Sequence, residues 1–173
     1  MSKEVTAGLP GRVFIFDSTA FYAGLPFAGT LHGYTTPQVL SEISHGKRGP
    51  SVEGILEAGR LKLEDASVDG LEKARRAASV SGDLRKLSAA DLSVIALAVD
   101  FKGKMAITLV SDDYALLNVA KILGLDHAST SMKTEMKLFR WLWYCPGCGK
   151  TYRDRAREVC DVCGSELKRK RRA

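Results

Sequence analysis

Val13-Phe14-Ile15-Phe16 is a continuous apolar run that ends at an aspartate, Asp17. A run without alternation of polar and apolar residues predicts a buried strand, central in a parallel sheet. Residues 106–110 form a second such run, which ends at Ser111 and the pair Asp112-Asp113. Ligands of open parallel sheets bind beyond the carboxyl ends of the strands. We therefore expect these two acidic groups to lie at the same edge of the sheet.

Helical patterns separate the two predicted strands and follow the second. The most apolar of them covers residues 88–101, with apolar side chains at helical spacing. Other helices are expected at residues 18–24, 36–46, 50–58, 71–80 and 114–123, with short strands at 61–64 and 135–144. Strands that alternate with helices over short connections predict an α/β sandwich on a mostly parallel sheet.

Two further acidic residues lie on the predicted helices. Glu42 is on the second helix, and Asp91 is at the start of the apolar one. Each acidic residue also has a local explanation. Asp17 and Asp112 can cap the helices that follow them, Ser88 with Asp91 fits a capping box, and Glu42 fits a surface position. Each local explanation is favoured for its residue alone, but together these elements can meet at one edge of the sheet.

Carboxylates that meet at one edge repel each other, so the predicted cluster needs a compensating cation. Hard oxygen ligands favour Mg²⁺ or Mn²⁺. A divalent ion in such a site can activate water and stabilise the charge that grows on a scissile phosphate, so no His, Ser or Cys nucleophile is required. The sequence contains no GxxxxGK[ST] or GxGxxG motif, so we expect no nucleotide cofactor.

All four cysteines lie near the C-terminus, where Cys145, Cys148, Cys160 and Cys163 form two CxxC pairs. Two such turns can present four thiolates in the tetrahedral geometry of a structural Zn²⁺, which leaves no open position for catalysis. Redox chemistry and two disulfides are the alternatives. Neither pair has the strand-to-helix setting of a redox motif, and a secreted disulfide framework would spread its cysteines more widely. The spacing therefore predicts a zinc ribbon.

The net charge of +6 is concentrated at the C-terminus. Residues 1–140 carry 17 Lys and Arg against 16 Asp and Glu, whereas residues 141–173 carry 9 against 4. Interleaved aromatic and basic residues can stack bases and neutralise phosphates, although basic side chains are also often simply solvated. The expected RNA contacts are Tyr152, Arg153, Arg155, Arg157, Lys168 and Arg169. For Trp141 and Trp143, packing against the large domain is the favoured interpretation.

The sequence has no recognisable signal peptide or membrane span, since its apolar runs are too short for either. The first 144 residues contain no cysteine. We therefore expect a cytoplasmic protein without membrane contact. Three segments are predicted: a nuclease-like domain over residues 1–139, a zinc ribbon over 140–166, and a disordered basic tail over 167–173.

Four short motifs resemble, in order, those of PIN-domain nucleases. They are VFIFDS at 13–18, LSEI at 40–43, LSAAD at 87–91 and LVSDDY at 109–114. Followed by a CxxC…CxxC ribbon, they resemble the archaeal Nin-one-binding protein family, endoribonucleases that mature the 3′ end of small-subunit ribosomal RNA. The resemblance covers nearly the whole chain and implies a PIN-like α/β/α sandwich with a small C-terminal zinc ribbon.

The resemblance also implies a catalytic site. It implies Mg²⁺ or Mn²⁺ held by Asp17, Glu42, Asp91 and Asp112, with Asp113 as an additional catalytic carboxylate. The implied substrate is single-stranded precursor ribosomal RNA on the pre-ribosomal small subunit, cut to a 3′-hydroxyl and a 5′-phosphate. Two alternatives stay open. One is a toxin-type PIN ribonuclease acting on tRNA or mRNA, against which the ribbon argues. The other is a non-catalytic RNA-binding ribosome assembly factor whose acidic residues are helix caps only.

Overall fold

The larger part of the molecule is built on a parallel β-sheet. The computed structural model describes residues 12–28, 31–45, 52–130, 141–152 and 158–171. Within them, five parallel strands have the order β3-β2-β1-β4-β5. The strands are β1 (Arg12–Phe16), β2 (Gly33–Thr35), β3 (Leu61–Leu63), β4 (Ala106–Val110) and β5 (His127–Ala128). The two apolar runs are the neighbouring strands β1 and β4, and β1 is central as predicted.

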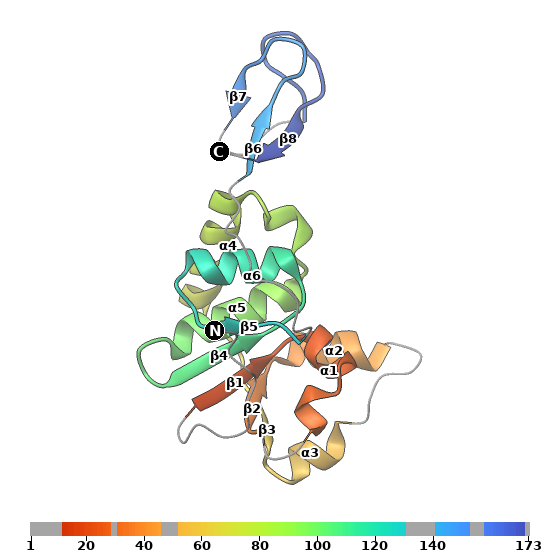
Figure 1. Cartoon of the computed structure of the whole chain (residues 1–173), viewed down its shortest axis with the longest axis vertical. Coiled ribbons are helices and arrows are strands. Elements are labelled where there is room, and N and C mark those ends of the chain that lie inside the picture. Colours follow the sequence, from red (N-terminus) through yellow and green to blue (C-terminus); the bar gives the residue numbers. More distant parts are fainter. Residues whose placement is uncertain (1–11, 29–30, 46–51, 131–140, 153–157, 172–173) are drawn as a thin grey trace.

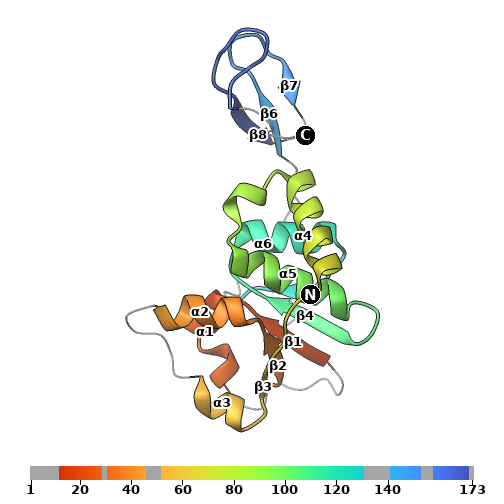
Figure 2. The same cartoon turned by 180° about the vertical axis from the view of Figure 1, so that it is seen from behind.

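Helices surround this sheet (Figure 1). They are α1 (Ser18–Tyr22), α2 (Pro37–His45), α3 (Glu53–Glu57), α4 (Val68–Ser81), α5 (Ala89–Phe101) and α6 (Tyr114–Ile122), with short 3₁₀ turns η1 (Leu25–Phe27) and η2 (Leu84–Lys86). In both views, α4, α5 and α6 lie toward the C-terminal ribbon, and α1, α2 and α3 lie away from it (Figures 1 and 2). None of the helices in the described ranges has the length and hydropathy of a membrane span. The predicted α/β fold class is confirmed.

Helix α5 is the centre of the core. Residues 94–98 are completely buried, because α5 contacts α2, α4 and α6 as well as strands β1 and β4. A helix that is enclosed on several sides has to be apolar around most of its circumference, which explains its composition. The N-terminus of α5 is the exception, since Asp91 there is only partly buried.

Strands β2 and β5 were not predicted, because three and two residues carry too little periodicity to recognise. Strands β2 and β5 form because the neighbouring strands β1 and β4 pair with them. A Cβ atom at Gly33 would lie 2.4 Å from Cε2 of Phe16 and 2.6 Å from the carbonyl oxygen of Phe14. Glycine at this position therefore lets β2 approach β1 closely enough to pair.

The C-terminal ribbon is a separate antiparallel sheet with the order β7-β6-β8. Its strands are β6 (Trp141–Tyr144), β7 (Thr151–Tyr152) and β8 (Lys168–Arg171). The disorder expected for residues 167–173 is wrong for 168–171, which pair with β6 along its whole length. Backbone pairing does not depend on side-chain charge, and the ribbon therefore continues to Arg171 instead of ending at 166. Of the strand expected at 135–144, residues 135–140 lie outside the described ranges.

The contact between α4 and α5 leads to a stability prediction at Gly70. An added Cβ would lie 2.9 Å from the carbonyl oxygen of Ala96 and 2.6 Å from Oδ1 of Asp100. Asp100 cannot move aside freely, because it accepts hydrogen bonds from the backbone and side chain of Ser67. Overpacking costs about 1–3 kcal/mol, more than the roughly 0.5–1 kcal/mol that alanine gains over glycine in a helix. We therefore expect Gly70→Ala to destabilise the protein in urea unfolding.

Gly54→Ala is the matched control for that substitution. Gly54 is also helical, but a Cβ there would meet nothing within 4 Å. Only the backbone effect applies, so we expect stabilisation by about 0.5–1 kcal/mol. The packing explanation is contradicted if both substitutions stabilise the protein equally.

Candidate active site and cysteine centre

Asp17 lies at the carboxyl end of β1, where the chain turns into α1. It is only 1% exposed and caps α1, since Oδ1 accepts a 2.9 Å hydrogen bond from the backbone of Ala20. Burial raises the pKa of Asp17. Hydrogen bonds from Ser111, Ala20 and Thr19 oppose this shift, while the nearby charge of Asp91 adds to it. Hydrogen bonds therefore hold the Asp17 carboxylate in one orientation, in a buried environment that disfavours its ionised form.

Two hydroxyl groups connect Asp17 to the end of β4. The Ser111 hydroxyl donates to Oδ2 of Asp17 and accepts from the backbone of Asp113 at 2.9 Å. The Thr19 hydroxyl donates to the same carboxylate at 2.8 Å and accepts from the backbone of Asp112 at 2.8 Å. Sequence reasoning missed both residues, although each stands within two positions of a predicted site aspartate. They lock the ends of the two central strands together.

Four carboxylates share one electrostatic environment at this edge. Burial raises the pKa of Asp91, hydrogen bonds from Ser88 oppose the shift, and the charges of Asp113 and Glu42 raise it further. Asp91 in turn raises the pKa of Asp17. In the described part of the chain, the ion pairs with Lys or Arg include none of the four residues Asp17, Glu42, Asp91 and Asp113. Their combined negative charge is therefore not compensated by basic side chains there.

Asp112 faces a different set of partners. Its carboxylate accepts hydrogen bonds from the hydroxyls of Ser129 and Thr130 and, at 2.8 Å, from the backbone of Thr130. Asp113, which sequence reasoning treated as an additional carboxylate, uses Oδ1 to cap α6 through the backbone of Ala115 at 2.6 Å. The charge of Asp113 acts on Asp91, and Asp112 holds the segment that follows β5.

Two of the three capping roles foreseen for these residues exist, whereas the cap foreseen for Asp112 is wrong, because its neighbour Asp113 caps α6 instead. Asp17 caps α1, Ser88 and Asp91 form a complete capping box on α5, and Asp113 caps α6. Capping and convergence are compatible, because the capped helix ends lie at one edge of the sheet. Glu42 is the exception, since it is an exposed residue in the middle of α2.

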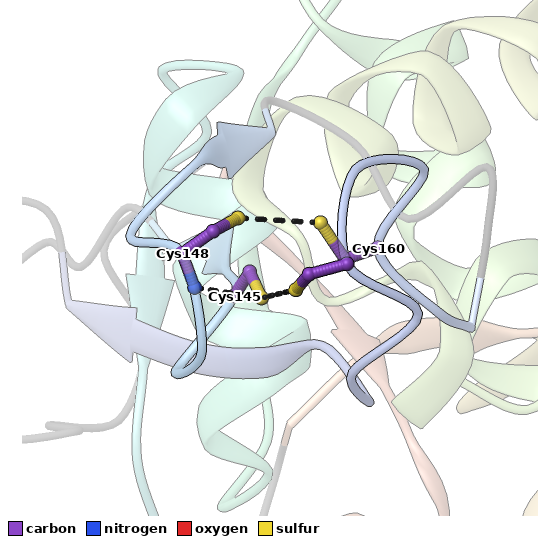
Figure 3. Close-up of side chains that lie close together, drawn as sticks. Cys145, Cys148 and Cys160 are labelled. Atoms are coloured by element: carbon purple, nitrogen blue, oxygen red, sulfur yellow. Dashed lines mark hydrogen bonds between the residues drawn. The ribbon is translucent and has the colours of Figure 1, made fainter.

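The four cysteines form the second candidate site. Their sulfur atoms all lie within 4.8 Å of one another, and none is in a disulfide. Cys145 Sγ is 3.2 Å from Cys163 Sγ, and Cys148 Sγ is 3.5 Å from Cys160 Sγ, a pair that faces across the centre in Figure 3. The cluster fits a small zinc ribbon.

The two CxxC turns have the same backbone design. Gly149 donates to the carbonyl of Cys145 at 2.9 Å, and Gly164 donates to that of Cys160 at 3.0 Å. Both glycines have left-handed backbone angles, with φ of 76° and 71°, which residues with a Cβ adopt at a cost. Two copies of one turn thus present the four sulfurs to a common point.

The residues predicted to contact RNA have different surroundings. Arg153, Arg155 and Arg157 lie outside the described ranges. Lys168 is exposed on β8, whereas Arg169 forms an ion pair with Asp83 of the large domain, with Nη2 and Oδ1 3.0 Å apart. The Trp143 side chain is partly buried against the cysteine cluster, and so is that of Tyr152.

Tyr152 supports the cysteine centre directly. Its hydroxyl lies 3.1 Å from Sγ of Cys160 and 2.6 Å from Oδ1 of Asp161, and Nζ of Lys150 lies 5.4 Å from its ring centroid. The contact with the Tyr152 hydroxyl, whose single proton is shared with Asp161, is the largest cause that lowers the pKa of Cys160, to about 6. A thiol with a lowered pKa is a thiolate at neutral pH, the form that binds metal.

This contact predicts that Tyr152→Phe weakens Zn²⁺ binding by about 10–100-fold, as losses of supporting hydrogen bonds around metal ligands do. A competition titration with a chromogenic chelator measures the effect. The phenyl ring can still stack on a base, so RNA affinity should not change when zinc is saturating. Tyr22→Phe, an exposed position on α1, is the control. Unchanged zinc affinity in Tyr152→Phe would contradict the supporting role.

The fold and the site define a class of protein, the PIN-domain ribonucleases. The sequence family described as "PIN domain of ribonuclease" matches residues 14–101. The chain is 34% identical to Endoribonuclease Nob1 of Pyrococcus abyssi, over 89% of this chain and 91% of that protein. It is 35% identical to Endoribonuclease Nob1 of Methanothermobacter thermautotrophicus, over 91% and 92%. Ribonuclease VapC1 of Thermoplasma acidophilum is 34% identical over 76% of this chain and 64% of that protein.

The chain belongs to the Nob1 family of PIN-domain endoribonucleases. Matches with the Nob1 proteins span about nine tenths of this chain and of each of those proteins. The resemblance drawn from the four acidic motifs and the cysteine pairs is therefore confirmed.

Proposed function

We propose that this protein is a metal-dependent endoribonuclease that cuts single-stranded precursor RNA at the 3′ end of small-subunit ribosomal RNA. The observation that carries the proposal is the electrostatic link among four carboxylates, in which the charge of Asp91 acts on Asp17 and the charges of Asp113 and Glu42 act on Asp91, without ion pairs to basic residues in the described part of the chain. A cluster with this excess of negative charge requires cations. The names of the Nob1 relatives support RNA as the substrate.

The carboxylates fit Mg²⁺ or Mn²⁺ as their cation. All four donors are hard oxygen atoms, which suit these two ions. The sequence motifs suggest Asp112 as the fourth ligand, but its carboxylate is engaged by Ser129 and Thr130. We therefore propose Asp113 as that ligand, beside Asp17, Glu42 and Asp91, with Asp112 as an organiser of the adjacent segment.

The proposed reaction is hydrolysis of one phosphodiester bond. A water oxygen bonds to phosphorus, the bond from phosphorus to the 3′ oxygen breaks, and the 3′ oxygen receives a proton, which gives a 3′-hydroxyl and a 5′-phosphate. A bound divalent ion supplies Lewis-acid stabilisation and a more acidic water. Thr19 and Ser111 hold Asp17 in one orientation, so this ligand needs little reorganisation when the ion and the substrate bind.

The cysteine centre fits Zn²⁺ as a structural ion. Four thiolates within 4.8 Å of one another can complete a tetrahedron and leave no site for water. We propose that the ribbon holds flanking RNA through exposed basic residues such as Lys168 and Lys170. Its place of action would be the pre-ribosomal small subunit in the cytoplasm.

The test is cleavage of RNA fragments that span the 3′ end of small-subunit ribosomal RNA. We expect one dominant cut with Mn²⁺ and none with a chelator. A fragment with a scrambled sequence at the cleavage junction is the control substrate. Absence of any metal-dependent cut would refute the nuclease proposal and would favour a non-catalytic assembly factor.

The VapC relatives support a second candidate, a ribonuclease that acts on tRNA or mRNA. These relatives match a smaller part of the chain, 76% and 66% against about 90% for the Nob1 proteins. Faster cutting of total tRNA than of the ribosomal fragment in the same assay would favour this candidate.

A further inference from the structure

Asp83 is a buried carboxylate outside the acidic cluster. It lies between α4 and η2 and is 2% exposed. Its Oδ2 accepts a 2.7 Å hydrogen bond from the side chain of Asn118 on α6, and its Oδ1 accepts a 3.0 Å hydrogen bond from Nη2 of Arg169 on β8. Nη1 of Arg169 also donates to the carbonyl of Gly82 at 3.3 Å. One guanidinium from the ribbon therefore binds both a buried carboxylate and the end of α4.

This contact differs in kind from a second ion pair that joins described residues of the two parts. Arg85 and Glu158 lie 3.6 Å apart, with side chains 59% and 72% exposed, and exposed pairs contribute little. The side chains of Arg169 and Asp83 are 16% and 3% exposed. A carboxylate buried to this degree without a cation is strongly unfavourable, so loss of one partner is far more costly than loss of a surface pair.

The alternation of side chains along β8 divides its basic residues into two groups. Successive residues of a strand point to opposite faces, so Arg169 faces away from Lys168 and Lys170. Both lysines are exposed, and Nζ of Lys170 lies 5.0 Å from the ring centroid of Tyr144. Arg169 therefore docks the ribbon, while the lysines on the other face stay accessible to a polyanion.

We propose that Asp83 and Arg169 form a docking contact that fixes the ribbon on the nuclease domain and thereby determines which phosphodiester reaches the acidic cluster. The ribbon stands beyond the end of α4, with β8 at its base (Figure 1). RNA held by a docked ribbon has a defined register relative to the cluster, whereas RNA held by an undocked ribbon does not. The inference that docking determines which phosphodiester is cut rests on the proposed function. Asp83 and Arg169 are positioning residues in it.

Asp83→Asn tests the docking. The substitution keeps the shape of the side chain and all ribbon residues, but removes the buried charge that Arg169 meets. Backbone ¹⁵N relaxation of the zinc-loaded full chain gives separate tumbling times for residues of the α/β domain and of the ribbon. We expect one common time in the wild type and a roughly twofold shorter time for the ribbon in Asp83→Asn, because an undocked small unit tumbles faster. Arg169→Gln should have the same effect.

Asp69→Asn is the matched control. It makes the same chemical change at the start of α4, where the carboxylate pairs with Lys73 and both side chains are more than half exposed. The tumbling times should stay equal. Common tumbling in both Asp83→Asn and Arg169→Gln would overturn the docking contact.

Cleavage position tests the second half of the inference. On a long precursor fragment, Asp83→Asn should spread the cut over neighbouring phosphodiesters. On an oligonucleotide too short to reach the ribbon, its rate should stay within about twofold of the wild type, because the acidic cluster is untouched. Separate tumbling with an unchanged cut position would overturn the positioning role. A wild type that cuts no RNA would overturn the proposed function and this role together, while the relaxation result still decides the docking.

Discussion

Replacing Asp17 with asparagine should reduce metal-dependent RNA cleavage at least about a hundredfold, because a divalent ion at the proposed site would supply several kcal/mol of transition-state stabilisation. Asp17 is the one buried carboxylate of the cluster and directly follows the central strand β1. Single-turnover cleavage at saturating Mn²⁺ measures the change. A loss of less than tenfold would contradict the proposed role of Asp17.

The fold should survive this substitution. Asparagine caps helices as well as aspartate does, so its side-chain oxygen can keep the bond from Ala20. Its amide group can donate to Ser111, whose hydroxyl then turns to another acceptor. Burial raises the pKa of Asp17, so removing the charge from the metal-free protein relieves an unfavourable burial. We therefore expect the melting temperature without metal to be unchanged or higher.

Two neighbouring variants identify the fourth ligand. Asp113→Asn should reduce cleavage about as strongly as Asp17→Asn, since we propose Asp113 as a ligand and its charge, like that of Glu42, adds to the effect of burial in raising the pKa of Asp91. Asp112→Asn makes the same chemical change one residue earlier, where the carboxylate is held by Ser129 and Thr130. It should have the smaller effect. The reverse order would support Asp112 as the ligand.

Removal of zinc should unfold the ribbon and leave the α/β domain intact. The buried apolar centre of the ribbon consists of Cys145, Cys160 and Leu167, with Trp143 and Tyr152 packed at its edge. A buried leucine contributes about 2 kcal/mol, whereas structural zinc supplies roughly 10 kcal/mol or more to a small domain. The metal is therefore the main source of folding energy here. The α/β domain has its own large core, with α5 at its centre.

Amide hydrogen exchange after chelation distinguishes the two parts. Protection should disappear from residues 141–152 and 158–171 but persist in β1, β4 and α5, and added Zn²⁺ should restore it. A Cys145→Ser variant should lack ribbon protection from the start and should not change on chelation. Loss of protection throughout the chain would show that the two parts fold as one unit and would contradict this prediction.

The main architecture and the convergence of the four cysteines were predictable from the sequence, because they depend on local patterns. The apolar runs of β1 and β4 predicted a parallel sheet, and the aspartates that follow them predicted an acidic edge. The CxxC spacing predicted four converging sulfurs. In each case neighbouring residues carry the information, since strand burial and tight turns are properties of a few consecutive positions.

Other features depend on partners that are distant in sequence, and the tertiary structure alone decides them. Strands β2 and β5 exist because neighbouring strands pair with them, and residues 168–171 are a strand because β6 offers an edge. The Asp112 carboxylate accepts a hydrogen bond from Ser129, whereas the charge of Asp113 acts on Asp91, and no local pattern reveals either interaction. Arg169 is basic like its neighbours, and only the buried Asp83 of the other domain gives it a different role. The role of a charged side chain depends on its burial and on the residues that it contacts, and the tertiary structure determines both.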